Sequence, residues 1–254
     1  MNFLFLVVLA DVPIRLRFNP VPNRRYDYNV LNDFVGSTGG RFGIFTEYDA
    51  AFRFEAKSNR FVLHGKLSNA KQTRDGTRSV DTAIAVSELN RTILGATFDS
   101  EGRLSGRFET TISPNPERFS STRPDELATY AFMNFQYPSR PLSVGSKWTA
   151  TVNGEKYWPS GEMIKTEGGQ KISVTYVVTG FSMVKGRTLV SIKGSVHAEI
   201  KMYAGPIDEH YVETVKEKDE FTIDSSDGLV VRARLEVKSK HLSETKKVVS
   251  FTRR

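Results

Sequence analysis

The stretch VSIKGSVHAEIKM, residues 190–202, decides the fold class of this chain. Strict alternation of apolar or small residues with polar ones predicts a β-strand with one buried face. Thirteen residues at about 3.3 Å each would extend roughly 40 Å, well beyond an ordinary strand, so the strand must curve around a core. The predicted buried face consists of Val190, Ile192, Gly194, Val196, Ala198, Ile200 and Met202. Its glycine relieves crowding on the concave side of a curved sheet.

Similar hairpins occur in both parts of the sequence. KISVTYVV, residues 171–178, alternates in the same way, and Lys185 and Gly186 form the predicted turn before the strand at 190–202. Residues 43–68, GIFTEYDAAFRFEAKSNRFVLHGKLS, predict a second hairpin with its turn near Ser58 and Asn59. Its predicted inward positions are Ile44, Thr46, Tyr48, Ala50, Phe52 and Phe54, then Phe61, Leu63, Gly65 and Leu67. Both returning strands therefore carry an inward glycine.

Two further stretches look like copies of each other: FDSEGRLSGRFETTIS, residues 98–113, and IDSSDGLVVRARLEVKS, residues 223–239. We expect the aspartate of each to start a turn in which its carboxylate accepts backbone N–H groups, while a following glycine adopts a positive φ. The pattern predicts one β-rich domain, residues 12–254, made of two similar halves, 12–120 and 138–254. Unrelated hairpins would also look alike, and the glycine is displaced by one residue between the copies.

A helix is predicted between the halves at residues 122–137, within STRPDELATYAFMNFQY. Ser121 or Thr122 suits the N-cap, and Pro124 suits the first turn. The helix carries more aromatic surface than one contact face needs. We therefore predict that it helps to line a ligand-binding site, with ordinary core packing as the alternative. The candidate ligand-binding residues are Leu127, Tyr130, Phe132, Phe135 and Trp148.

The N-terminal run MNFLFLVVLA contains no charged residue and is too short to cross a bilayer as a helix. Residues 1–11 therefore form a signal-like segment, which predicts a secreted or periplasmic protein; a first strand of the fold is the alternative. The sequence has no cysteine, which excludes disulfides, thiolate metal sites and cysteine nucleophiles. It carries no familiar catalytic or metal-binding motif, so we expect a non-enzymatic protein without a metal or cofactor.

The formal net charge is +7, and the basic residues are scattered at the alternate spacing typical of the solvent face of a sheet. Residues 215–220, VKEKDE, fit such a solvated face with weak cross-strand ion pairs. No nucleic-acid-binding motif accompanies the charge, so we predict no nucleic acid partner. Anionic components of the cell envelope are the predicted partners of the basic face, and a monomer is expected.

The phrase YPSRPLSVGSKWTATV, residues 137–152, has the pattern P..P..VG..W. It resembles a group of uncharacterised secreted bacterial β-rich proteins in which this phrase introduces the second half of the chain. More distantly, the long strands with a helix between two halves resemble the lipoprotein-carrier class, which includes the periplasmic lipoprotein chaperones. That resemblance implies an incomplete antiparallel barrel with helices on its concave side. This sequence departs from the class in having one predicted helix and no lipobox cysteine.

Together these patterns predict a mainly β protein, a strongly curved antiparallel sheet or half-barrel with one central helix on its concave face. A two-sheet β-sandwich is the alternative. The predicted function is that of an exported protein that binds an apolar or amphipathic ligand, such as a lipid, in the concavity between sheet and helix. The alternative is a structural or interaction protein of the cell envelope with no small-molecule ligand.

Overall fold

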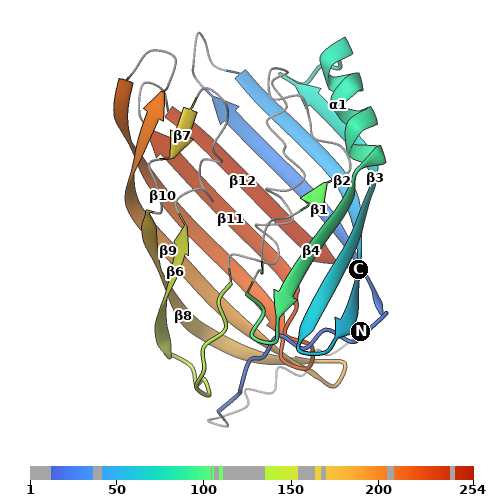
Figure 1. Ribbon diagram of the computed structural model, residues 1–254, viewed down its shortest axis with the longest axis vertical. Helices are drawn as coiled ribbons and strands as arrows, with labels where there is room; N and C mark the ends of the chain where they lie inside the picture. The colour runs from blue at the N-terminus through green and yellow to red at the C-terminus, as the bar shows by residue number, and fades with distance from the viewer. Residues whose placement is uncertain are drawn as a thin grey trace, which may run out of the picture.

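The computed structural model describes residues 13–36, 42–103, 105, 109–110, 135–153, 164–166, 170–204, 209–240 and 244–254. These residues form one helix, α1 (Val80–Arg91), and a single 12-stranded sheet (Figure 1). The first strands are β1 (Arg25–Gly36), β2 (Phe42–Lys57), β3 (Arg60–Arg74), β4 (Ile93–Asp99) and β5 (Glu109–Thr110). The others are β6 (Lys147–Asn153), β7 (Ile164–Thr166), β8 (Lys171–Val184), β9 (Arg187–Ala204), β10 (Glu209–Asp224), β11 (Val230–Lys240) and β12 (Glu244–Arg253).

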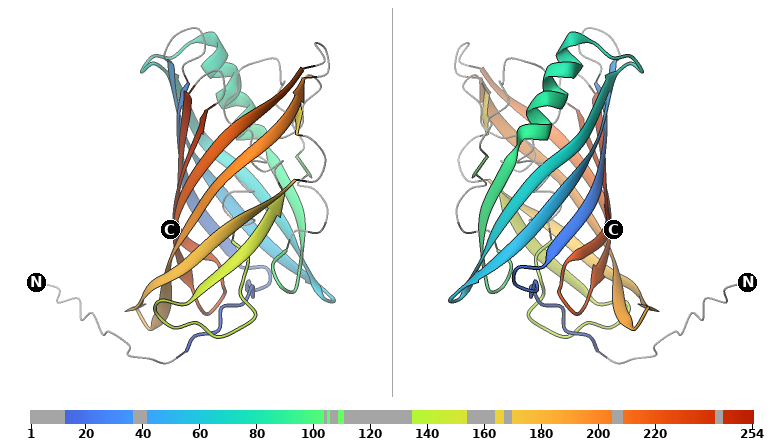
Figure 2. Two further views of the ribbon diagram at one scale, coloured as in Figure 1. Left: turned by 90° about the vertical axis from the view of Figure 1, so that its left-hand side faces the viewer. Right: turned by 90° about the vertical axis from the view of Figure 1, so that its right-hand side faces the viewer.

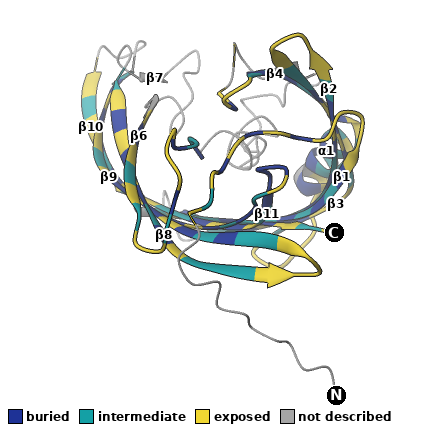
Figure 3. Cartoon of the chain, turned by 90° about the horizontal axis from the view of Figure 1, so that it is seen from below, coloured by how far each residue is buried: buried dark blue, intermediate teal, exposed yellow. Residues whose placement is uncertain are grey.

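The strand order is β5-β4-β3-β2-β1-β12-β11-β10-β9-β8-β6, and β7 also pairs with β9. Every pairing between named strands is antiparallel. Within the described residues the end strands β5 and β6 do not pair with each other, so the sheet curls strongly without closing into a barrel (Figure 3). This confirms the predicted curved antiparallel sheet, and the two-sheet sandwich was wrong.

The first and last described strands join the two sides of the sheet. β1 pairs with β12 from Tyr28 opposite Arg253 to Val35 opposite Lys246, so β1–β5 lie on one side of this ladder and β6–β12 on the other. The strand order therefore groups β1–β5 and β6–β12, while the division of the chain into two similar halves stays a prediction. That the two sides arose as copies of one unit stays a prediction.

Alternation along the strands is as predicted. On β9 every predicted inward residue is buried except Ala198, which is half-buried. All six inward positions of the strand at residues 43–57 are buried as well. Lys185 and Gly186 form a two-residue turn with positive φ angles of 50° and 74°, the geometry that favours a tight hairpin.

Each of the two inward glycines stands opposite an aromatic residue on the neighbouring strand. Gly65 pairs with Phe52, and Gly194 pairs with Tyr176. A Cβ atom on Gly65 would lie 2.9 Å from ring carbons of Phe52, and one on Gly194 would lie 3.1 Å from a ring carbon of Tyr176. Each glycine therefore leaves room for the aromatic ring of the opposing strand, which covers the exposed backbone on the concave face.

The helix α1 was not predicted. Ser79 caps it by accepting the amide of Thr82 at 3.3 Å, and its buried residues include Ala85 and Leu89. It lies alongside the second half of β3, above β4 (Figure 2), and Oδ1 of Asn90 accepts the amide of Ala70 at 2.9 Å. The helix thus covers an edge of β3 that none of the described strands pairs.

The predicted central helix falls almost wholly outside the described residues, which exclude 122–134. Its expected last residues, 135–137, run as irregular chain, so the predicted C-terminal end was wrong. The reason in the sequence is the nearby proline pair, Pro138 and Pro141, which disfavours helical backbone in the residue before each proline. The signal-like residues 1–11 also lie outside the described residues.

Candidate functional site on the concave face

Two irregular segments run across the lower end of the curved sheet, the end drawn at the bottom of Figure 1 (Figures 1 and 2). We call residues 13–24 and 135–146 the lower plug. Ile14 and Leu142 join the two segments by a pair of backbone hydrogen bonds, both 2.8 Å long. Leu16, Phe18 and Leu142 are buried in the main hydrophobic core, so the lower end of the concave face is filled by side chains.

Phe18 is the centre of the lower plug. Its ring lies 5.6 Å from that of Phe54, 5.4 Å from Phe61 and 5.3 Å from Phe98, measured between centroids. Two of the three contacts are edge-to-face, an arrangement favoured by the charge distribution of aromatic rings. Phe18 therefore packs the plug against strands β2, β3 and β4.

Both predicted Asp-Gly turns also meet the lower plug. The carboxylate of Asp99 accepts the amide of Glu101 at 2.9 Å, and that of Asp224 accepts the amide of Ser226 at 3.0 Å. Gly102 and Gly228 have φ angles of +77° and +72°, as predicted. A Cβ atom on Gly102 would lie 2.7 Å from that of Phe18, and one on Gly228 would collide with the backbone of the same segment. The two turns are thus shaped to receive the plug.

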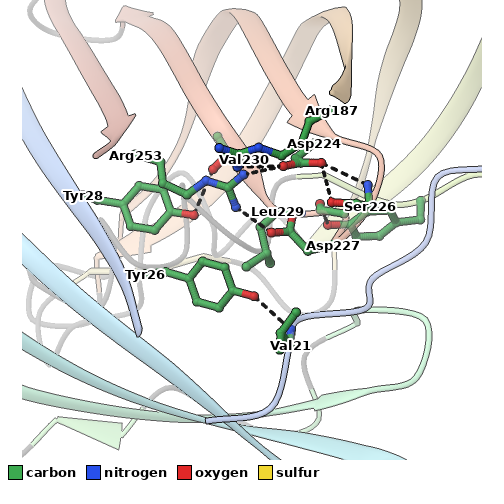
Figure 4. A network of polar contacts seen from close by, with 12 residues as sticks. Val21, Tyr26, Tyr28, Arg187, Asp224, Ser226, Asp227, Leu229, Val230 and Arg253 are labelled. Carbon is green, nitrogen blue, oxygen red and sulfur yellow. Dashed lines mark hydrogen bonds and ion pairs between the residues drawn. The ribbon is translucent and has the colours of Figure 1, made fainter. Parts of the chain in front are cut away.

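A buried ionic network fastens the turn after β10 to the C-terminal end of β12 (Figure 4). The guanidinium group of Arg253 donates to Asp227 at 2.8 Å and to Asp224 at 2.9 Å. The side chains of Arg253, Asp224 and Asp227 are only 7%, 1% and 3% exposed. Arg187 adds a longer contact to Asp224, at 3.2 Å. Charges this well buried are tolerated only when they are paired and hydrogen-bonded.

The two carboxylates of this network have opposite pKa shifts. Burial alone would raise the pKa of Asp224, but hydrogen bonds from Ser226 and the charge of Arg253 bring it below its ordinary value. Burial raises the pKa of Asp227, and the charge of Arg253 only partly offsets that rise. The difference arises because Asp224 accepts both the amide and the hydroxyl of Ser226, whereas Asp227 accepts the amide of Leu229.

The network also holds the lower plug in place. The backbone carbonyl of Asp227 accepts the amide of Asn19 at 3.0 Å. Tyr137 donates its hydroxyl to the carbonyl of Gly228 at 2.7 Å, and the hydroxyl of Tyr26 accepts the amide of Val21 at 2.9 Å. These bonds attach both segments of the plug to one corner of the sheet.

The first residue of the second plug segment, Phe135, also belongs to an aromatic cluster, which we define as Phe135, Trp148, Tyr176 and Phe221. Trp148 stacks on Tyr176 with ring centroids 5.1 Å apart, and Phe135 meets Trp148 edge-on at 5.7 Å. Phe135 also lies 5.7 Å from Phe221. The indole nitrogen of Trp148 donates to the carbonyl of Gln136 at 2.9 Å, which fixes the ring.

The structure therefore brings together two of the five predicted ligand-binding residues, Phe135 and Trp148. Leu127, Tyr130 and Phe132 lie outside the described residues. Phe135 is buried and Trp148 is half-buried, and their contacts with a ligand stay a prediction. The alternation of residues 171–178 puts Tyr176 on an inward strand face, but no local pattern connects it or Phe221 with the site, because only the strand register shows that they share it.

Polar side chains occupy the concave face beyond the aromatic cluster. Asn32, Thr46 and Gln72 stand opposite one another on β1, β2 and β3, and Gln72 donates to Thr46 at 3.0 Å. On β10 the carboxylates of Glu213, Glu217 and Asp219 are also buried. The prediction that residues 215–220 form a solvated face was wrong for Glu217 and Asp219. The prediction missed the burial of Glu217 and Asp219 because carboxylates alternate with lysines in this stretch, so both faces of the strand look polar in sequence.

The described residues contain no group of three or more histidine, aspartate or glutamate side chains that could hold a metal ion. No helix in the described part of the chain is long and apolar enough to cross a membrane.

Comparison with known proteins shows a likeness of fold. No family model and no curated protein sequence matches the chain. A solved structure described as "Lipid-protein interactions in lipovitellin" is similar, with a TM-score of 0.55 and 12% sequence identity. The match covers 92% of this chain and 25% of that one. This chain thus resembles a portion, about a quarter, of a protein that interacts with lipid. The likeness is consistent at this coarse level with the expected lipid-carrier-like β fold.

Proposed function

We propose that this protein binds an apolar or amphipathic ligand, such as a lipid, on the concave face of its curved sheet. The observation that carries the proposal is the shape of the sheet: it curls around a concave face, one end is filled by the lower plug, and the edges β5 and β6 are not joined to each other in the described residues. The fold likeness to lipovitellin supports a lipid as the class of ligand.

The side chains of the concave face favour an amphipathic ligand. In the aromatic cluster Phe135, Tyr176 and Phe221 are buried, and the half-buried Trp148 offers rigid apolar surface. Each methylene group of an acyl chain gains about 0.8 kcal/mol when it leaves water. Asn32, Thr46 and Gln72 lie on the same face and belong to the side-chain types that hydrogen-bond polar groups. We propose that the acyl portion of the ligand contacts Phe135 and Trp148, while its polar portion lies nearer Asn32, Thr46 and Gln72.

The same reasoning gives the remaining parts of the proposal. Binding rather than catalysis is proposed because the sequence carries no familiar catalytic motif. Export is proposed because residues 1–11 are signal-like, and a secreted or periplasmic carrier would meet lipid outside the cytoplasm.

The first test is native mass spectrometry of the protein purified from cells, followed by organic extraction. We expect a co-purifying lipid near one per chain. The second test locates the ligand: Trp158→Phe leaves Trp148 as the single tryptophan, and brominated fatty acid quenches tryptophan fluorescence at short range. We expect brominated fatty acid to quench Trp148 and its unbrominated analogue not to do so.

The control places the reporter on the other face. Phe45 is 42% exposed and points away from the buried face of β2. In the background Trp148→Phe with Trp158→Phe, a tryptophan introduced by Phe45→Trp should not be quenched. Equal quenching of both reporters, or a clean apo mass together with no quenching of Trp148, would contradict the proposed function and leave the envelope scaffold as the better hypothesis.

A further inference from the structure

The convex face of the sheet carries a dense group of lysines over β10, β11 and β12. Their side chains are exposed and alternate with inward residues along each strand. We define the convex lysine patch as Lys216, Lys218, Lys238, Lys240 and Lys246. The sequence shows only lysines at alternate spacing, and the strand register is what gathers them on one surface.

The register places like charges directly opposite each other. Lys216 pairs with Lys238, and Lys238 pairs with Lys246, so three ammonium groups lie in one row across three adjacent strands. Directly opposed like charges destabilise a sheet, so nothing in the folding of the sheet calls for this row. An anionic partner that binds this surface would reduce the electrostatic repulsion between the lysine ammonium groups, so the row favours such a partner.

Among the side chains that the structure describes, one carboxylate lies between the five lysines, and the strand register also places Glu244 of β12 opposite Lys240. Glu236 contacts Lys238 at 3.3 Å and Lys246 at 3.5 Å. Burial alone would raise the pKa of Glu236, but these two lysines bring it below its ordinary value. The patch thus keeps an excess of positive charge, bordered by Glu199 and Glu220 on the neighbouring convex positions.

The excess is local. On the convex side of β1 and β2 the basic side chains are accompanied by five carboxylates: Asp27, Asp33, Glu47, Asp49 and Glu55. Arg25 contacts Asp27 at 2.7 Å, and Arg254 contacts Asp49 at 2.8 Å. The positive charge of the convex face is therefore concentrated over β10–β12 and is not a general property of the sheet.

We propose that the convex lysine patch docks the protein on an anionic lipid bilayer. Most of the basic side chains on this face are lysines, whose ammonium groups act as mobile point charges and suit a continuous anionic surface. Arg232 and Arg234 of β11 are also exposed there and add to its positive charge. About four to eight clustered basic residues characterise surfaces that bind anionic membranes. The patch contains no aromatic side chain on which nucleic acid bases could stack.

Docking by this patch leaves the ligand face free. β12 and β11 lie in the middle of the strand order, and the unjoined edges β5 and β6 lie at its two ends. The patch is therefore on the back of the curved sheet, opposite the gap between these edges (Figure 3). Docking does not rest on the proposed function, since it needs no ligand on the concave face.

The test is sedimentation of the full chain with vesicles of phosphatidylcholine alone or mixed equally with phosphatidylglycerol. We expect binding to the mixed vesicles only. It should weaken as salt is raised, since the screening length falls from about 10 Å at 0.1 M salt to about 3 Å at 1 M. The triple variant Lys216→Glu, Lys238→Glu and Lys246→Glu should lose at least tenfold in affinity.

A matched control reverses three exposed lysines elsewhere: Lys57→Glu, Lys66→Glu and Lys71→Glu change the net charge equally and should keep most of the binding. The milder triple variant Lys216→Gln, Lys238→Gln and Lys246→Gln removes opposed charges, so it should fold and still lose binding. Equal loss in the patch and control variants, binding to neutral vesicles, or tighter binding to duplex DNA at the same salt would overturn the proposal. None of these outcomes bears on the quenching of Trp148 by brominated fatty acid, so the docking proposal and the proposed function are tested separately.

Discussion

Arg253 brings a guanidinium group between two carboxylates that are themselves out of contact with solvent. We expect Arg253→Met to lower the free energy of unfolding by about 3 to 5 kcal/mol, because it leaves Asp224 and Asp227 buried without their main counter-charge. Arg254→Met is the control, since Arg254 is 58% exposed in its pair with Asp49 and should cost less than about 1 kcal/mol. Urea denaturation of the two variants measures both values, and equal losses would contradict the assignment.

Asp224 and Asp227 should affect the acid stability of the protein in opposite directions. The pKa of Asp224 is lowered by folding, so its contribution is present above its ordinary value and is lost as pH falls through the folded pKa. The pKa of Asp227 is raised by folding, so its contribution is present at low pH and is lost as pH rises through the folded pKa.

Asp224→Asn should therefore flatten the fall in the free energy of unfolding below about pH 4, where the lowered pKa of Asp224 acts. Asp227→Asn should steepen the fall in the range above about pH 4, between the ordinary pKa of an aspartate and the raised pKa of Asp227 in the folded protein. The measurement is the slope of stability against pH from a series of denaturation curves. Because it uses slopes, it is independent of the overall stability each variant loses. Identical slopes in the two variants would show that the carboxylates do not differ as described.

Gly65 tests the close contact between glycine and aromatic ring on the concave face. Gly65→Ala places a Cβ atom 2.9 Å from the ring of buried Phe52 and 3.1 Å from Leu94. We expect a loss of about 1 to 3 kcal/mol in the free energy of unfolding, as in other overpacked cores. Gly180→Ala is the control, because its Cβ atom would meet nothing within 4 Å. A neutral Gly65→Ala would show that the ring moves aside freely.

At the scale of the element, α1 substitutes for a strand along the second half of β3. Asn90→Ala removes the acceptor of the Ala70 amide, and we expect hydrogen exchange in the peptide covering residues 68–74 to accelerate by about tenfold. Residues 60–66 provide the internal control, because β4 pairs with them directly. Acceleration in both peptides would indicate general destabilisation rather than a local effect at this edge.

The elements differed in how well the sequence predicted them. Long strands such as β2 and β9 were predictable because burial repeats every two residues over many positions. The helix α1 was missed because VDTAIAVSELNR has few large apolar residues, and its start is marked by Ser79 and Thr82 rather than by the usual glutamate. In the candidate site, Phe135 and Trp148 stood out as large aromatics. Their partners Tyr176 and Phe221 depended on pairings between strands that no local pattern encodes.

At the scale of the whole molecule, Phe18 connects the lower plug with the strands of the first half and with the turn at Gly102. We expect Phe18→Ala to lower the free energy of unfolding by about 3 to 5 kcal/mol, because it opens a cavity where several rings meet. Val21→Ala, in the same segment but 46% exposed, should change it by less than about 0.5 kcal/mol. Thermal or urea unfolding compares the two, and a mild effect of Phe18→Ala would mean that the plug is loosely held.

The ladder between β1 and β12 sets the order in which the molecule can be completed. Tyr28 stands opposite Arg253, so partners at the middle of the sheet are more than 200 positions apart in the sequence. On the ribosome, the strands β1–β5 therefore emerge long before the strand that joins them to the rest. Distant pairings of this kind make folding slow. We expect a chaperone to meet this chain with its central strands still apart, and the continuous concave surface to form only after β12 has been synthesised.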